Sequence, residues 1–307
     1  MTHLFSHPSG LDHDTGAHHP ERPDRLRAVL KALQAPAFDA LERREAPEAT
    51  TAQIARVHPQ AQIEAVLRAV PKQGLAHIDA DTVVSPGSGV AALHAAGALV
   101  AAVDAVAGGH ARSAFCAVRP PGHHAEPGRA MGFCLFNNVA IGAMQARHEH
   151  GLQRIAVIDF DVHHGNGTQA FAWEDRDLFY ASTHQMPLYP GTGRAAEKGI
   201  GNIVNAPLPP GADGEDFRAV MSNEVLPALK RFGPDLVMIS AGFDAHARDP
   251  LANLNLVEDD YAWATRELMA VADDYAGGRV VSCLEGGYDL QALAASAAAH
   301  VRELMAV

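Results

Sequence analysis

The chain has few cysteines and a minority of basic residues. Only Cys116, Cys134 and Cys283 occur in 307 residues, and no two of them form a Cys-x-x-Cys pair. This spacing argues against a disulfide framework and a cysteine zinc site, and it fits a reducing cytoplasm. The 24 Lys and Arg residues face 36 Asp and Glu residues, which gives a formal net charge of −12. An acidic balance opposes nucleic-acid binding and would weakly attract cationic peptides or polyamines.

Long apolar runs and low-complexity tracts are also missing. The N-terminus lacks the basic-then-apolar pattern of a secretion signal. The most apolar window, residues 90–107, is mostly alanine and contains His94 and Asp104, so it predicts a buried helix rather than a membrane span. With 48% hydrophobic residues and no break in composition, the sequence favours one α/β domain over residues 1–307. Its oligomeric state is not encoded in any recognisable pattern.

Apolar periodicity predicts alternating helices and strands. Helical patterns occupy residues 22–34, 60–70, 90–107, 137–149, 215–232, 258–275 and 290–305. Short apolar runs predict buried strands at residues 114–118, 154–160, 178–182, 235–240 and 279–284. This alternation is typical of a mainly parallel sheet with helices on both faces.

Residues 158–167 (Ile-Asp-Phe-Asp-Val-His-His-Gly-Asn-Gly) place two acids and two histidines at the end of a predicted strand. Side chains alternate along a strand, so Asp159, Asp161 and His163 are expected on one side near its carboxyl end. Open α/β sheets bind ligands at that edge. Carboxylate and imidazole together suit zinc or a similar divalent ion. A solvated loop is the alternative, but an acid in an apolar strand is costly unless it is paired or metal-bound.

Three other polar clusters, at residues 119–126, 241–250 and 285–288, also follow predicted strands. Because the carboxyl ends of parallel strands share one edge, a single site could gather residues that are distant in sequence. The candidates for that site are His123, His124, Asp161, His163, Asp244 and Tyr288. Alone, a histidine pair indicates a turn in which the imidazole hydrogen bonds are satisfied locally, and a tyrosine indicates a core aromatic residue. We keep that reading for His18-His19.

The motifs together resemble the histone deacetylase superfamily, and more closely its class II-like members and the bacterial deacetylases and acetylpolyamine amidohydrolases. Six segments carry the resemblance in the family's order: His19-Pro-Glu-Arg-Pro-Asp-Arg25, Arg119-Pro-Pro-Gly-His-His124, Gly132-Phe-Cys-Leu-Phe-Asn-Asn138, residues 159–167, Ala241-Gly-Phe-Asp244 and Glu285-Gly-Gly-Tyr288. The resemblance implies the single-domain arginase/deacetylase-like fold, with the active site in loops at the strand ends.

The resemblance also implies a ligand set for a catalytic zinc ion. Asp161, His163 and Asp244 would bind zinc and leave a position open for water and the substrate carbonyl. His124 would be the general base and then the general acid, while His123 would pair with Asp159 and stay largely cationic. Two further residues complete this expectation: Asn166, found where class I enzymes carry aspartate, would orient His124, and Tyr288 would donate to the oxyanion.

The remaining implications concern the substrate tunnel and a second cation. Phe133 and Tyr189 match two aromatic rings that wall a narrow tunnel in the family, and Tyr189 replaces a usual phenylalanine. Leu251 stands where polyamine-specific relatives carry glutamate, so it favours acetyl-lysine. The potassium ligands implied by the family are Asp159, Asp161, the carbonyl of His163, Ser182 and the carbonyl of Thr183. Arg25 would line an acetate exit or form an ordinary buried ion pair, and Asp79 or Asp81 would lie on the substrate rim or in a solvated loop.

These features predict a zinc-dependent amidohydrolase that deacetylates acetyl-lysine in proteins or peptides, with an acetylpolyamine deacetylase as the alternative. An arginase-like ureohydrolase would need a second metal, for which Ser240-Ala-Gly-Phe-Asp244 offers one acid where two are required. An acyl-lysine binding module without catalysis is the other rival, although a binder has no use for a proton shuttle.

Overall fold

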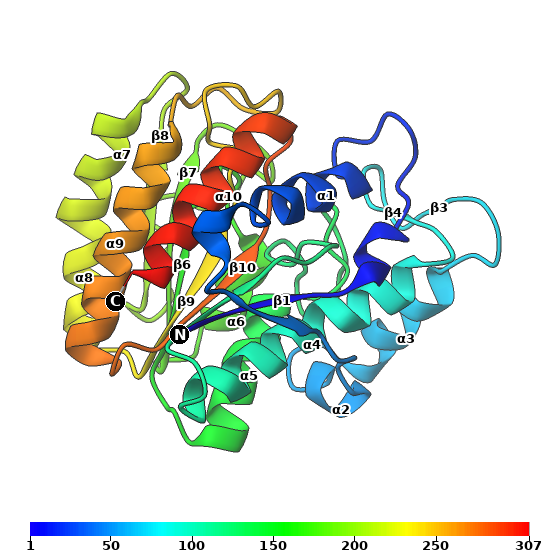
Figure 1. Cartoon of the computed structure of the whole chain (residues 1–307), viewed down its shortest axis with the longest axis horizontal. Coiled ribbons are helices and arrows are strands. Elements are labelled where there is room, and N and C mark those ends of the chain that lie inside the picture. Colours follow the sequence, from blue (N-terminus) through cyan, green and yellow to red (C-terminus); the bar gives the residue numbers. More distant parts are fainter. Residues whose placement is uncertain (307) are drawn as a thin grey trace.

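The computed structural model describes residues 1–306, and these build one eight-stranded sheet covered by helices (Figure 1). Every strand pair in this sheet is parallel, in the order β2-β1-β5-β10-β9-β6-β7-β8. The strands are β1 (Thr2–Ser6), β2 (Glu42–Glu45), β5 (Ser113–Cys116), β6 (Ile155–Asp159), β7 (Leu178–Gln185), β8 (Ile203–Leu208), β9 (Leu236–Ala241) and β10 (Val280–Leu284). A separate antiparallel pair joins β3 (Ala76–His77) and β4 (Val83–Val84).

The helices lie on both faces of the sheet, as the alternation of elements predicts. They are α1 (Pro23–Ala32), α2 (Thr51–Ile54), α3 (Gln60–Ala69), α4 (Ser88–Ala107), α5 (Asn138–His150), α6 (Asn166–Ala172), α7 (Gly214–Val220), α8 (Leu226–Phe232), α9 (Glu258–Tyr275) and α10 (Leu290–Met305). Alternate residues of one strand enter opposite cores, as Leu4 and Phe5 of β1 illustrate. Helices α1, α9 and α10 cover the Leu4 face, whereas α4 and α5 cover the other (Figure 1).

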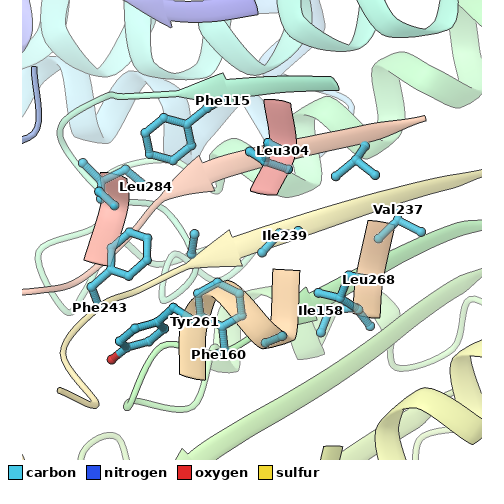
Figure 2. Close-up of a cluster of buried hydrophobic side chains, with 14 of the residues drawn as sticks. Phe115, Ile158, Phe160, Val237, Ile239, Phe243, Tyr261, Leu268, Leu284 and Leu304 are labelled. Carbon is cyan, nitrogen blue, oxygen red and sulfur yellow. The ribbon is translucent and has the colours of Figure 1, made fainter. Parts of the chain in front are cut away.

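The larger core is filled where the strand ends meet α9 and α10 (Figure 2). Phe160 and Phe243, which follow β6 and β9, pack with Tyr261 of α9 at ring-centroid distances between 5.1 and 6.1 Å. These buried rings lie directly beside the loops that carry Asp161 and Asp244. The hydrophobic packing therefore fixes the ends of the two loops on which the candidate metal ligands stand.

Helix α4 is the one described helix with the length and apolar composition of a membrane span. Of its most apolar window, 61% is buried inside the fold, where it packs against α5. The buried core helix of a protein can have the same length and apolar composition, so α4 is weak evidence for a membrane span.

The helix predicted over residues 215–232 is interrupted in the structure. Between α7 and α8, residues Met221–Val225 form a π-helical turn, and the N–H of Leu226 donates to the carbonyl of Met221. Pro227 lacks the N–H that a continuous α-helix would need at that point, so the preceding turn widens. Apolar periodicity over this segment does not report that change.

Candidate active site

Asp161, His163 and Asp244 converge at the carboxyl edge of the sheet. All three are buried, and their candidate ligand atoms lie within 4.8 Å of one another. Nδ1 of His163 lies 3.1 Å from Oδ1 of Asp161 and 3.0 Å from Oδ2 of Asp244. Within residues 1–306 this is the only such cluster of three potential metal ligands. Two carboxylates and one imidazole form a donor set that suits one zinc ion.

The prediction that Asp161 and His163 share a strand face with Asp159 is wrong in its local geometry. Strand β6 ends at Asp159, and the two later residues lie in the following loop. The loop bends because Oδ1 of Asp159 accepts the N–H of Asp161, and Oδ1 of Asp161 in turn accepts the N–H of His163. The side chains converge through these turns rather than through strand alternation.

Two glycines let neighbouring loops approach the carboxylates closely. A Cβ atom on Gly286 would lie 2.1 Å from Oδ2 of Asp244, and one on Gly242 would lie 2.0 Å from Oδ2 of Asp161. The N–H of Gly286 also donates to Oδ2 of Asp161 at 2.8 Å. A side chain at either glycine would fill the space in which the carboxylates meet.

The electrostatics of the cluster favour a bound cation. Burial alone would lower the pKa of His163, but its hydrogen bonds with Asp161 and Asp244 raise that pKa to about 10. Two buried carboxylates thus demand positive charge at this point. A divalent ion would supply that charge and displace the proton, because metal ligands bind in their deprotonated form.

The surroundings shift the pKa values of the adjacent His123 and His124 in opposite directions. Nδ1 of His123 lies 3.0 Å from Oδ2 of Asp159, and although burial opposes it, the charges of Asp161 and Asp159 raise the pKa of His123 well above its usual value. Nδ1 of His124 lies 2.8 Å from Oδ1 of Asn166. Burial and the charge of His123 lower the pKa of His124 well below the usual value. One ring is therefore cationic and its neighbour neutral.

A cavity of about 220 Å³ adjoins the metal cluster and the histidine pair. It is lined by Asp81, His124, Gly132, Phe133, His163, Leu188, Tyr189, Leu251 and Tyr288. Phe133 is the one described non-glycine residue with a positive φ, at 69°. Such a conformation persists only where the surrounding structure enforces it, and here Thr82 Oγ1 accepts the N–H of Phe133 at 3.2 Å. Tyr189, 38% exposed, stands at the solvent side.

Comparison with known proteins identifies the family. Residues 19–304 match the model of the histone deacetylase domain. The chain belongs to the histone deacetylase family. It is 40% identical to histone deacetylase 14, chloroplastic, of Arabidopsis thaliana, over 98% of this chain and 76% of that one. It is 39% identical to the histone deacetylase-like amidohydrolase of Pseudomonas aeruginosa, over 93% and 77%. The solved HDA15 HD domain superposes with a TM-score of 0.93 at 35% identity, covering 99% of this chain and 88% of that one.

Membership of the histone deacetylase family makes the chain a hydrolase of that family, and the fold predicted from the motifs is confirmed by the HDA15 HD domain. The structure brings together the residues predicted for zinc, for proton transfer and for the tunnel. Asn166 stands at the start of α6, and Ser182 of β7 lies directly across from Asp159 of β6. The neighbouring Thr183 is buried, and its Oγ1 has no hydrogen-bond partner among the described residues.

Tyr288 is held from several directions. Its N–H donates to Oδ2 of Asp249 at 2.7 Å, and the guanidinium carbon of Arg25 lies 4.9 Å from its ring centroid. Burial raises the pKa of the Tyr288 phenol well above its usual value, so the hydroxyl keeps its proton. Arg25 forms a buried ion pair with Glu21, with 2.9 Å between Nη1 and Oε1. The structure thus supports the ion-pair reading of Arg25.

The two rim acids separate in the structure. Asp81 lines the tunnel, whereas Asp79 caps the same turn by accepting the N–H groups of Asp81 and Thr82. His19, which the sequence assigns to an ordinary turn, lies with its Nε2 2.9 Å from the Asp81 carbonyl and its ring edge-on to Phe133. It therefore joins the N-terminal segment to the tunnel wall.

Sequence reasoning missed the residues that hold these side chains in place. Glu285 accepts the N–H groups of Gly122 and His123, at 2.7 and 3.2 Å. The Tyr180 hydroxyl donates to Oδ2 of Asp159 at 3.1 Å. Glu126 accepts a hydrogen bond from Asn166. Glu285 begins the Glu285-Gly-Gly-Tyr288 motif and Glu126 ends the polar cluster of residues 119–126, so both had a signal in the sequence. Tyr180, by contrast, reads as one more apolar residue of a buried strand.

Proposed function

We propose that this chain is a zinc-dependent deacetylase that hydrolyses the acetyl amide of N-ε-acetyl-lysine in proteins or peptides. One observation carries the proposal: Asp161, His163 and Asp244 adjoin a narrow cavity that is also lined by His124 and Tyr288. Metal ligands, a neutral imidazole and a phenol donor thus face one space in which an acetyl group fits. A binding module would need the cavity but not the imidazole or the metal ligands.

The three ligands would hold zinc, which when bound supplies a Lewis acid that polarises the acetyl carbonyl and lowers the pKa of water. His124 is neutral and takes the proton of the attacking water. The Tyr288 hydroxyl donates to the oxyanion that forms on the former carbonyl oxygen. His124 then returns its proton to the leaving nitrogen, the C–N bond breaks, and acetate and the free lysine amine result. Cationic His123 favours the negative charge that develops nearby.

The preference for lysine over polyamine rests on Leu251. It lines the cavity with the apolar wall residues Phe133 and Leu188. Leucine offers apolar contact to a peptide flank, whereas a carboxylate at this partly desolvated position would attract a second ammonium group. Asp81 also lines the cavity, and it would meet either kind of substrate. Acetylpolyamine hydrolysis therefore remains the second candidate, with the chain's net charge of −12 in its favour.

Potassium and localisation are parts of the same proposal. Potassium would bind beside the zinc site through Asp159, Asp161, Ser182 and the carbonyl groups of His163 and Thr183. The placement of Ser182 opposite Asp159 supports this assignment. A cytoplasmic location accords with three buried cysteines that form no disulfide.

The test of the proposed function is turnover of acetylated amines by the purified protein. We expect hydrolysis of a fluorogenic acetyl-lysine peptide, reversible loss of activity on chelation, recovery with zinc, and inhibition by hydroxamates. Asp244→Ala should lose both zinc and activity, because two ligands hold the ion poorly. Asp259→Ala, a carboxylate change at the first turn of α9, is the control and should keep both. A zinc-loaded wild type that hydrolyses no acetylated amine would overturn the proposal.

Substrate choice is tested by comparing acetyl-lysine peptides with acetylspermidine and acetylputrescine. We expect a higher kcat/KM for a peptide in the wild type and a shift toward the polyamines in Leu251→Glu. Leu251→Gln introduces a side chain with nearly the shape of glutamate but no charge, so it should not shift the preference toward polyamines. If the wild type prefers polyamines over every peptide tried, the lysine assignment is wrong while the zinc amidohydrolase remains.

A further inference from the structure

Asn166 forms hydrogen bonds with two residues at once, and one of them has no place in the mechanism above. Its Oδ1 lies 2.8 Å from Nδ1 of His124, and its Nδ2 donates to Oε1 of Glu126 at 2.7 Å. Glu126 is half-buried, and its backbone is fixed by two hydrogen bonds with Arg129, at 2.9 and 3.3 Å. A carboxylate, an amide and an imidazole therefore form a continuous chain that ends at the tunnel.

The donors and acceptors of Glu126, Asn166 and His124 allow only one arrangement of these hydrogen bonds. An ionised carboxylate only accepts hydrogen bonds, so Glu126 must face the NH₂ group of Asn166. The amide oxygen then faces His124, and because it can only accept, Nδ1 of His124 must carry the hydrogen. In a neutral imidazole the other nitrogen, Nε2, is then left with its lone pair. That is the tautomer a general base at Nε2 requires.

We propose that Glu126 is a positioning residue that fixes the orientation of the Asn166 amide and, through it, the tautomer of His124. This inference rests on the proposed function, in which His124 is the general base. Glu126 touches no substrate and transfers no proton in this scheme. The amide of Asn166 could otherwise face His124 with either its oxygen or its NH₂ group. Glu126 holds the NH₂ group, so that only the oxygen faces His124.

The other contacts of the Asn166 amide nitrogen are too weak to replace Glu126. They are the His124 carbonyl at 3.5 Å and the Met131 sulfur at 3.4 Å. Without the carboxylate, the amide can turn over and present its NH₂ group to Nδ1 of His124. That arrangement selects the tautomer with hydrogen on Nε2, which cannot take a proton from water. An aspartate at position 166 would not have this ambiguity, since both of its oxygens accept.

The activity test compares the same truncation in two backgrounds. In the wild-type background, which has asparagine at position 166, Glu126→Ala should lower kcat about 10- to 150-fold, the loss typical of one hydrogen bond to a charged group, with little change in KM. Glu126→Gln keeps one acceptor oxygen but can also present its NH₂ group to Asn166, so its kcat should lie between those of the wild type and of Glu126→Ala. In an Asn166→Asp background, Glu126→Ala should lower kcat less than about two-fold. The aspartate still offers an acceptor oxygen to His124, and the substitution removes a second carboxylate that would repel it.

Glu174→Ala is the matched control, because Glu174 lines the same open surface groove of about 660 Å³ as Glu126 and Asn166 but forms no hydrogen bond to Asn166. It should leave kcat unchanged, which separates the hydrogen bond from the general acidity of the groove. A Glu126→Ala loss of the same size in both backgrounds would overturn the inference.

A second measurement determines the tautomer of His124 and does not depend on enzymatic activity. In ¹⁵N-edited NMR of the metal-free protein, the His124 ring, assigned by its absence in His124→Asn, should carry its hydrogen on Nδ1 in the wild type. Glu126→Ala should shift the population toward Nε2–H. A wild type with hydrogen on Nε2 would overturn the inference by itself. If the wild type hydrolyses no acetylated amine, the proposed function fails, and the NMR result still decides the role of Glu126.

Discussion

The backbone at Tyr288 leaves its side chain little freedom. Gly287 has φ of 121°, in the region that favours glycine, and a Cβ atom there would lie 2.9 Å from a methyl group of Leu293. The N–H of Tyr288 is held by Asp249, and Arg25 lies over the ring. A phenol fixed in this way needs little reorganisation when an oxyanion forms beside it.

Removing that hydroxyl should therefore affect the chemical step alone. We expect Tyr288→Phe to lower the single-turnover rate by roughly 10² to 10³, the cost typical of one lost oxyanion donor, with zinc content and hydroxamate binding retained. Tyr189→Phe removes a hydroxyl from the exposed tunnel tyrosine and should change the rate less than about three-fold, because no mechanistic role falls to that group. If Tyr288→Phe keeps more than half of the rate while chemistry is limiting, its assigned role is wrong.

The sequence predicts the residues that carry chemistry better than those that support them. Asp161, His163 and Tyr288 closely follow predicted strands, and a polar group just after an apolar strand already indicates a site. Glu126 and Asp249 meet their partners only through loop folding, across 40 and 39 residues respectively. Their contacts depend on the paths of separate loops, which no spacing along the chain encodes.

Among the elements, helix α4 packs closely against the backbone of residues 47–49, and a glycine makes this possible. A Cβ atom on Gly97 would lie 1.9 Å from the carbonyl oxygen of Pro47 and 2.7 Å from the N of Ala49. Both contacts are backbone atoms, so they cannot move aside as a flexible side chain would. The segment from residue 46 to residue 49 therefore lies directly against the helix because position 97 has no side chain.

This contact reverses the usual sign of a glycine substitution. Glycine to alanine inside a helix normally stabilises by about 1 kcal/mol. We expect Gly97→Ala to lower the free energy of unfolding by about 1 to 3 kcal/mol, the cost of an overpacked site. Gly89→Ala in the first turn of the same helix should be neutral or stabilising, because its Cβ would meet only side-chain carbons at 3.4 and 3.6 Å. Urea unfolding measures both, and equal effects would contradict this account.

Elements with a strong apolar period are predicted well, and edge strands are not. The predicted helices over residues 258–275 and 290–305 coincide with α9 and α10. Strand β2 reads Glu-Arg-Arg-Glu, is largely exposed, and lies at one edge of the sheet, so it has no hydrophobic signal. Strand β8 forms the opposite edge and contains Pro207, which argues against a strand when read from sequence. Pairing with an existing sheet, rather than local preference, makes both of them strands.

At the scale of the whole molecule, one parallel sheet directs the loops that carry the metal ligands, the histidine pair and Tyr288 to the same edge. The loops after β5, β6, β9 and β10 carry the histidine pair, two groups of metal ligands and Tyr288. These four strands are neighbours in the order β5-β10-β9-β6. Segments up to 165 residues apart, such as those of His123 and Tyr288, therefore adjoin one cavity because their strands end at the same edge of the sheet.

Burial also keeps two histidines neutral that are not part of the catalytic cluster. His300 of α10 lies between the Thr265 and Ser282 hydroxyl groups, at 2.6 and 2.8 Å, and burial lowers its pKa to about 3. Burial lowers the pKa of His58 to about 4. Both pKa values are below the 6.5 of an unfolded chain. Above pH 6.5 both states are neutral, and the full stability is present.

As the pH falls below about 6.5, the unfolded chain binds protons that the folded chain does not, so stability is lost progressively toward pH 4 for His58 and pH 3 for His300. We expect the wild-type free energy of unfolding to fall over this range. His300→Gln removes one such site, so its slope should be shallower by up to about 1.4 kcal/mol per pH unit, even if the variant is less stable at pH 7.5.

The exposed His148 provides the control, because His148→Gln should keep the wild-type slope. Urea unfolding at pH 7.5, 6.5, 5.5 and 4.5 gives the slopes. Taking the difference between each variant and the wild type at every pH cancels contributions common to both, including any loss of bound metal. A His300→Gln protein whose slope equals that of the wild type would mean that His300 does not stay neutral in the folded state, and that the acid sensitivity of the fold arises elsewhere.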